Sequence, residues 1–218
     1  MTKKKKRIIA IVILIAMVVT TILGVAITVS AKDKQQTAYV YIGDSRTVQL
    51  DKLIGMSTMT DTFVIAKSGM GYNWWTHTGS TQLSEIRKNN PSYTNWIYIF
   101  NLGVNDLVNV DKYKMLLPSL ESEATVYFLS VNPTVDAVKG IQCKDIEQFN
   151  NSIKPVCSNY IDSYSYLKDT GYYAKDGMHY DDKTYQNLYT FITTSVQLNE
   201  FLKQQKEPGD YVKYLIAQ

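Results

Sequence analysis

The chain of 218 residues carries 23 Lys and Arg residues against 20 Asp and Glu residues, a formal net charge of +3 at pH 7. Five of the cations form one cluster, Lys3 to Arg7, and the other 18 basic residues face 20 acidic ones. The excess positive charge therefore belongs to the amino terminus. The rest of the chain is slightly acidic, so its net charge gives no electrostatic argument for nucleic-acid binding.

The amino-terminal segment 1–31 is predicted to be a signal-anchor. Ile8 to Val29 is an apolar run of 22 residues without a charge, and a helix of that length crosses a hydrocarbon core of ~30 Å. The run exceeds the roughly 7–15 residues of a secretory signal core, which favours an uncleaved transmembrane helix. Val29-Ser30-Ala31 resembles a small-residue cleavage site, so a cleaved signal and a secreted domain remain the alternative. By the positive-inside rule, both place everything after Ala31 outside the cytoplasm.

Residues 32–37 form a short polar tether, and residues 38–218 are long enough for one domain with a substantial core. Strand-like and helix-like segments alternate along it. The expected strands cover 38–42, 62–67, 96–100 and 124–131, with a short run at 160–163, and the expected helices cover 46–53, 80–88, 112–120, 145–154 and 183–203. This alternation predicts right-handed βαβ crossovers, and hence an α/β fold with helices on both faces of a parallel sheet.

Two cysteines, Cys143 and Cys157, would face an oxidising compartment, where disulfides form. The helix expected between them would hold the two residues much further apart than the ~7 Å Cα separation that a disulfide allows. We therefore expect two unpaired thiols, and two isolated cysteines do not indicate a metal site.

Polar motifs follow the predicted strands. Ser45 comes directly after the first strand, Gly69 after the second and Asn105 after the third, whereas Asp176 and His179 precede the last helix. In parallel α/β sheets, ligands bind beyond the carboxyl ends of the strands, so these residues are expected to converge on one rim. A serine hydroxyl becomes a nucleophile when a histidine takes its proton, and a carboxylate holds that histidine in the required tautomer.

Four sequence blocks resemble those of the SGNH (GDSL-type) hydrolases. They are Gly43-Asp44-Ser45, Ser68-Gly69-Met70-Gly71, Gly103-Val104-Asn105-Asp106 and Asp176-Gly177-Met178-His179. The blocks stand in the expected order, and the resemblance covers residues 38–203. The resemblance implies a flavodoxin-like, three-layer α/β/α sandwich. It also implies that Ser45 is the nucleophile, that His179 is the general base and then acid, and that Asp176 orients the imidazole.

The same resemblance implies an oxyanion hole made by the backbone N–H groups of Ser45 and Gly69 and by the Asn105 side chain. Gly71 is the alternative donor in the second block. Neither a cofactor nor a metal is implied. Asp44 and Asp106 are expected to support their loops rather than to react.

Residues near these blocks suggest what the site binds. Arg46 stands where the family pattern has leucine, so we expect a cation near the site and a polar or anionic substrate. Tyr72, Trp74 and Trp75 follow the second block, either as core packing or as a stacking platform for a sugar ring. His77, the only other histidine, is expected at the substrate rim or on the surface.

Together these features predict a membrane-tethered, extracytoplasmic serine esterase. Its expected substrate is a small-molecule or glycan ester, above all the O-acetyl groups of a cell-envelope or extracellular carbohydrate. One alternative is an O-acyltransferase that passes the acyl group to a glycan through the same site. The other alternative is a non-catalytic surface binding module. Such a module would be expected to lack the nucleophilic serine or the histidine base, and this chain has both.

Overall fold

A parallel five-stranded sheet forms the centre of the domain. Its strands are β1 (Thr37–Gly43), β2 (Thr62–Ala66), β3 (Asn95–Asn101), β4 (Thr125–Leu129) and β5 (Tyr160–Ile161), in the order β2-β1-β3-β4-β5. All four pairings are parallel. β1 and β3 are rich in aromatic and β-branched residues and are buried along most of their length, as strands covered on both faces require.

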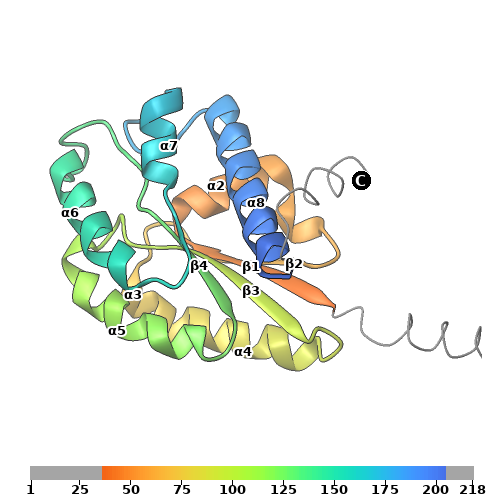
Figure 1. Cartoon of the computed structure of the whole chain (residues 1–218). Coiled ribbons are helices and arrows are strands. Elements are labelled where there is room, and N and C mark those ends of the chain that lie inside the picture. Colours follow the sequence, from red (N-terminus) through yellow and green to blue (C-terminus); the bar gives the residue numbers. More distant parts are fainter. Residues whose placement is uncertain (1–35, 205–218) are drawn as a thin grey trace, which may run out of the picture. The chain divides into compact units, whose positions relative to one another are not determined.

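The structure, a computed structural model, describes residues 36–204 (Figure 1). The predicted anchor, residues 32–35 of the predicted tether and the tail 205–218 lie outside this range. Among the described residues, no helix has the length and apolar character needed to span a membrane.

Helices cover both faces of the sheet, so the domain has three layers (Figure 1). One face packs against α4 (Ser80–Asn89), α5 (Val110–Glu121) and α6 (Cys143–Ile153). The other packs against α2 (Ser45–Ile54), α7 (Ser163–Thr170) and α8 (Asp182–Gln204). Alternate residues of one strand serve the two cores, for example Phe100 on the first face and Ile99 on the second. The predicted fold class is therefore confirmed.

Two helical segments differ from the sequence prediction. The loop after β2 is shorter than expected, because α3 (Tyr72–Trp74) and a π-helical turn (Trp75–Gly79) run directly into α4. The helical path therefore begins before residue 80, since Gly79 already has helical dihedrals and no side chain caps α4. The short helix α7 was not predicted, because its polar sequence shows no clear apolar stripe.

Both cysteines are free thiols, as predicted. Cys143 begins α6, and Cys157 follows the 3₁₀ turn Lys154–Val156 beyond that helix. Each sulfur donates to a nearby backbone carbonyl instead, Cys143 Sγ to Thr134 O and Cys157 Sγ to Ile153 O.

The register of the sheet aligns the carboxyl ends of its central strands. Gly43, the last residue of β1, pairs with Ala66 at the end of β2 and with Asn101 at the end of β3. The loops that follow these strands therefore start side by side, and they carry three of the four sequence blocks.

The loop after β4 is held in place by one buried side chain. Asn150 of α6 is 6% exposed. Its Oδ1 accepts from Val131 N at 2.8 Å, and its Nδ2 donates to Val131 O at 2.9 Å. This pair satisfies two buried backbone groups where the ladder of β4 has ended, and it fixes the chain that leads to Asn132 and Pro133.

We expect Asn150→Ala to lower the free energy of unfolding by roughly 2–4 kcal/mol, because both groups of Val131 lose a buried partner. Urea unfolding of the full-length chain, followed by circular dichroism, measures this change. The matched control is Asn151→Ala, the same substitution at the next, exposed position of α6. Equal stabilities of the two variants would contradict the assigned role.

Candidate active site

Ser45 lies at the junction of β1 and α2. Asp44 is the N-cap of α2, and its Oδ1 accepts from Arg46 N at 2.9 Å. Ser45 is the first residue of the helix, where backbone N–H groups have no acceptor within the helix. Its side chain is therefore presented at the sheet rim beside a free N–H donor. The expectation that Asp44 supports the turn is confirmed.

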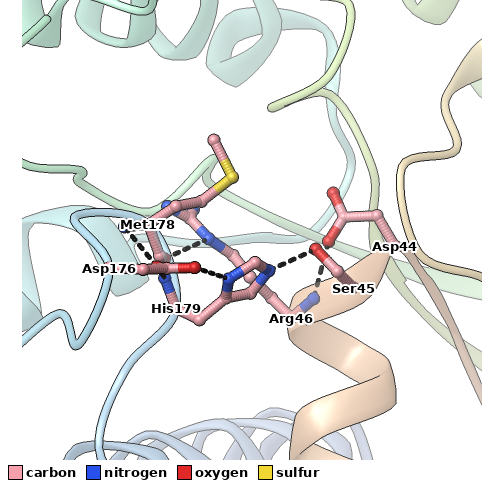
Figure 2. Close-up of polar contacts among 6 residues, drawn as sticks. All are labelled: Asp44, Ser45, Arg46, Asp176, Met178 and His179. Atoms are coloured by element: carbon pink, nitrogen blue, oxygen red, sulfur yellow. Dashed lines mark hydrogen bonds and ion pairs between the residues drawn. The ribbon is translucent and has the colours of Figure 1, made fainter. Parts of the chain in front are cut away.

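His179 joins Ser45 to Asp176 in one chain of hydrogen bonds (Figure 2). His179 Nε2 lies 2.7 Å from Ser45 Oγ, and His179 Nδ1 lies 2.7 Å from Asp176 Oδ2. An ionised carboxylate accepts but does not donate, so it selects the tautomer with the proton on Nδ1. Nε2 is then free to accept the proton of Ser45, which is the arrangement that general-base catalysis requires.

Asp176 also organises the loop that carries His179. Its Oδ1 accepts from the backbone N–H groups of Met178 at 3.0 Å and His179 at 2.7 Å. These bonds, led by the backbone N–H and the side chain of His179, hold the pKa of Asp176 well below its usual range. The carboxylate therefore stays ionised and keeps the imidazole oriented.

The Asn105 amide, a proposed oxyanion donor, lies beside the turn that carries Ser45. Asn105 Nδ2 donates to Met70 O at 2.9 Å and makes a longer bond to Asp44 Oδ2 at 3.3 Å. The asparagine amide thus bridges the loops of the first two blocks. Of its two bonds, the long one to Asp44 is the one that an oxyanion can more readily replace.

The two glycines of the second block have different surroundings. A Cβ on Gly71 would overlap the carboxylate of Asp106, whereas Gly69 has φ +75° and open space around its Cβ position. Gly71 is thus required for packing, and Gly69 has a backbone conformation that other residues rarely adopt. We keep Gly69 as the proposed donor.

Asp106 connects these loops to α5. It accepts from Tyr72 N at 2.7 Å, from Asn109 Nδ2 at 3.1 Å and from the Tyr113 hydroxyl at 2.8 Å. Its predicted bracing role is confirmed, and it fixes the Asn105 loop against the segment that follows Gly71.

The prediction that Arg46 binds substrate is wrong. Its side chain is buried, and the guanidinium donates to three backbone carbonyls, those of Met178 at 3.2 Å, Asn132 at 2.8 Å and Pro133 at 3.1 Å. The guanidinium carbon also lies 5.2 Å from the centre of the Tyr180 ring. Arg46 therefore links the helix of Ser45 to the loop of His179, and it is not available to a ligand.

Trp75 is also not a stacking platform. It is 1% exposed and packs edge-on against Phe100, with 5.3 Å between ring centres. Tyr72 and Trp74 are half-buried against the same core. The helical path that begins at Tyr72 turns these rings inward, and sequence alone did not show where that helix starts. His77 is exposed, and its Nδ1 lies 2.7 Å from Asn73 O.

Two cavities lie near the site, one lined in part by His179 and the other by Asn105. One of about 450 Å³ includes His179 and Asp176 in its lining, together with residues of α2 and the start of α8. The other, of about 380 Å³, lies beside Asn105 and Met178 and is mostly apolar. Apart from Val104 and Asp106 of the third block, the other lining residues belong to ordinary helix and loop positions that carry no sequence motif. In residues 36–204, no cluster of three or more His, Cys, Asp or Glu side chains is placed to hold a metal ion.

No protein-family model matches the chain, and no curated protein matches its sequence. Solved structures do match its fold. The C-terminal catalytic domain of peptidoglycan O-acetyltransferase A from Streptococcus pneumoniae has a TM-score of 0.56 at 13% identity, over 74% of this chain and 93% of that chain. An acetylxylan esterase from Geobacillus stearothermophilus has a TM-score of 0.51 at 12% identity, over 74% of this chain and 96% of that one.

A member of the lipolytic G-D-S-L family from Veillonella parvula is similar as well, with a TM-score of 0.53 at 11% identity, over 72% of this chain and 97% of that chain. At these identities the likeness establishes the fold. The chain therefore has the α/β fold of the SGNH (GDSL-type) hydrolases, as the four sequence blocks implied.

We expect Arg46→Met to lower kcat for a small ester about 100-fold, because three buried carbonyls lose their donor and the His179 loop shifts relative to Ser45. KM should change less, since Arg46 does not face the ligand. Steady-state kinetics on a variant shown to be folded by circular dichroism test this, and Arg46→Lys should restore part of kcat. A folded Arg46→Met variant with the parental kcat would contradict the linking role.

Burial raises the pKa of Asp44 to about 6, against the opposing effects of the Arg46 charge and N–H. The folded chain thus binds this proton more tightly than the unfolded chain, whose Asp pKa is about 3.9. The resulting stabilisation is full below about pH 4 and is lost as the pH rises through about 6. Asp44→Asn should remove this dependence.

Urea unfolding of the parent and Asp44→Asn at pH 4, 5, 6 and 7 isolates the effect, because every other group titrates in both. The unfolding free energy of the parent should fall by roughly 1–3 kcal/mol relative to the variant across this range. A constant difference would show that the pKa of Asp44 is not raised.

Proposed function

We propose that the protein is a serine esterase that acts through an acyl-enzyme on Ser45. The observation that carries this proposal is the unbroken chain Ser45–His179–Asp176, with both hydrogen bonds at 2.7 Å, at the carboxyl end of a parallel sheet. The rival reading as a binding module expects a broken nucleophile or base, and these contacts give no support to it.

The proposed reaction has two balanced halves. Ser45 Oγ attacks the carbonyl carbon of the ester while its proton passes to His179 Nε2. The electron pair of the C=O bond moves onto the carbonyl oxygen, which becomes the oxyanion. The oxyanion then collapses, the bond to the alcohol oxygen breaks, and His179 returns the proton to the leaving alcohol. Water repeats the sequence on the acyl-enzyme and releases the acid. The N–H groups of Ser45 and Gly69 and the Asn105 amide are the proposed oxyanion donors.

The proposed substrate is an O-acetyl ester of a carbohydrate. Support comes from two of the similar structures, one an acetylxylan esterase and one the catalytic domain of a peptidoglycan O-acetyltransferase. The proposed recognition of the sugar does not involve Arg46, Trp74 or Trp75, because these side chains lie in or against the core.

We further propose that the domain works outside the cytoplasm, tethered by residues 1–31. The support is the basic cluster Lys3 to Arg7, followed by the uncharged apolar run Ile8 to Val29. Cell fractionation combined with protease accessibility of the intact cell surface tests this placement.

Transfer of the acyl group to a glycan is the second candidate. The similarity to an O-acetyltransferase domain favours it. Hydrolysis and transfer share the first half-reaction and differ in whether water or a sugar hydroxyl enters the second. Acetate release measured with and without an oligosaccharide acceptor separates the two, since a transferase forms acetylated glycan at the expense of free acetate.

We expect Ser45→Ala and His179→Ala each to lower kcat for 4-nitrophenyl acetate by at least about 10³-fold, because neither half of the reaction proceeds without both groups. Ser84→Ala and His77→Ala are the matched controls, at exposed positions whose side chains bond to none of the site residues, and they should retain activity. Activity that survives in folded Ser45→Ala would contradict the assigned nucleophile. A folded but inactive parent would favour the binding module.

A further inference from the structure

We infer that a groove between α8 and the start of β1 and β2 is the docking site for the tail 205–218 of the same chain, whose apolar run 211–216 fills it. This groove, called the α8 groove below, has a volume of about 240 Å³. It lies toward the amino-terminal ends of the two strands, whereas the Ser45 rim lies at their carboxyl ends (Figure 1). Its walls include Tyr39 and Tyr41 of β1, Met59 before β2, and Tyr189, Val196 and Gln197 of α8.

Aromatic and apolar side chains make up most of these walls. The rings of Tyr41 and Tyr189 lie 6.4 Å apart between centres, and the Tyr189 hydroxyl donates to Met59 Sδ at 3.7 Å. Met59 is nevertheless 38% exposed. A hollow with an apolar, partly exposed lining is a typical binding surface, because covering it removes apolar area from water.

Two polar side chains of the α8 groove lack a strong partner within residues 36–204. Tyr41 is 6% exposed, and its hydroxyl forms no hydrogen bond with a described residue. A buried hydroxyl without a hydrogen bond is costly. Asp61 is exposed and forms no ion pair in the same range, and its carboxylate accepts only from the Thr62 hydroxyl, at 3.4 Å. An occupant is therefore favoured if it brings both a hydrogen-bonding group and a positive charge.

The α8 groove leads to the point where the tail begins. Val196 and Gln197 line it, and Phe201, four residues beyond Gln197, continues the same face of α8 and is 9% exposed. The helix ends at Gln204, and residue 205 is the first of the tail. The tail is thus the part of this chain that starts nearest to the α8 groove along the helix.

The sequence of the tail has the chemistry that the α8 groove requires. Its run 211–216 reads Tyr-Val-Lys-Tyr-Leu-Ile, so two tyrosines and three aliphatic residues surround one cation, Lys213. A tyrosine hydroxyl can bond with that of Tyr41, and the Lys213 ammonium group can pair with Asp61. The aliphatic side chains supply the apolar area.

The tail is also long enough to reach. Pro208-Gly209 favours a turn, which lets the following residues run back along α8. The helix from Tyr189 to Gln204 is about 22 Å long at 1.5 Å per residue. An extended chain from Gln204 to Tyr214 spans up to ~33 Å, so the run 211–216 can lie anywhere along the α8 groove.

Amide hydrogen exchange of the full-length chain in detergent, read by mass spectrometry on peptides from 205–218, tests this docking. The reference is the synthetic peptide 205–218, which has no groove to bind. Gln197→Trp fills the α8 groove from the helix, and Leu215→Ser removes an apolar group of the tail. The matched control is Gln186→Trp, the same substitution at an exposed position of α8 that does not line the groove. Circular dichroism checks that each variant is folded.

We expect the tail amides of the parent to exchange at least about tenfold more slowly than those of the peptide. Gln197→Trp and Leu215→Ser should each remove most of this protection, because the apolar contact is blocked or lost. Gln186→Trp should keep it. Asp61→Lys and Lys213→Asp should each raise the exchange rate about twofold to fivefold, and their combination should restore the parental rate, because the charge pair is then reversed rather than removed.

Tail amides that exchange in the parent as fast as in the peptide would overturn the inference. Protection that survives both Gln197→Trp and Asp61→Lys would also overturn it, since the tail would then pack elsewhere. Protection that rises with protein concentration would assign the tail to a second copy of the chain, and protection that varies with detergent concentration would assign it to the micelle surface. Either result would contradict docking within one chain.

Discussion

The hydrogen bond between Ser45 Oγ and His179 Nε2 is the contact on which the rest of the site depends. It joins side chains 134 positions apart in the sequence at 2.7 Å, so the sheet must bring both ends of the domain to one rim. The parallel register does so, because Gly43 pairs with the ends of both β2 and β3. A slip of one residue in β1 would turn every side chain of that strand to the opposite face and move Ser45 away from its partner.

Two charged side chains beside the nucleophile are buried, and their partners explain how the fold tolerates them. A buried charge is costly unless hydrogen bonds replace its hydration. The guanidinium of Arg46 donates to three carbonyl oxygens, all from the two loops that flank the site. Asp44 is left with fewer donors, and burial accordingly raises its pKa to about 6. The charge next to Ser45 thus serves the geometry of the site and does not recognise the ligand.

The strand–helix alternation predicted the sheet, its parallel direction and the rim where the motifs meet, because periodicity and strand-end position are local properties of the sequence. The same reasoning misjudged Arg46 and Trp75. Both errors have one cause: whether a side chain points inward depends on where a helix begins and on which carbonyls a distant loop presents.

The central claim is that Ser45 becomes acylated during turnover. The full-length chain is mixed with 4-nitrophenyl acetate, the reaction is quenched rapidly, and peptide mass mapping then locates any acetyl group. This experiment tests the claim directly. The account predicts one acetyl group on the peptide that contains Ser45, and none there in His179→Ala. Turnover without a modified Ser45, or an acetyl group on another residue that forms and decays at the rate of turnover, would contradict it.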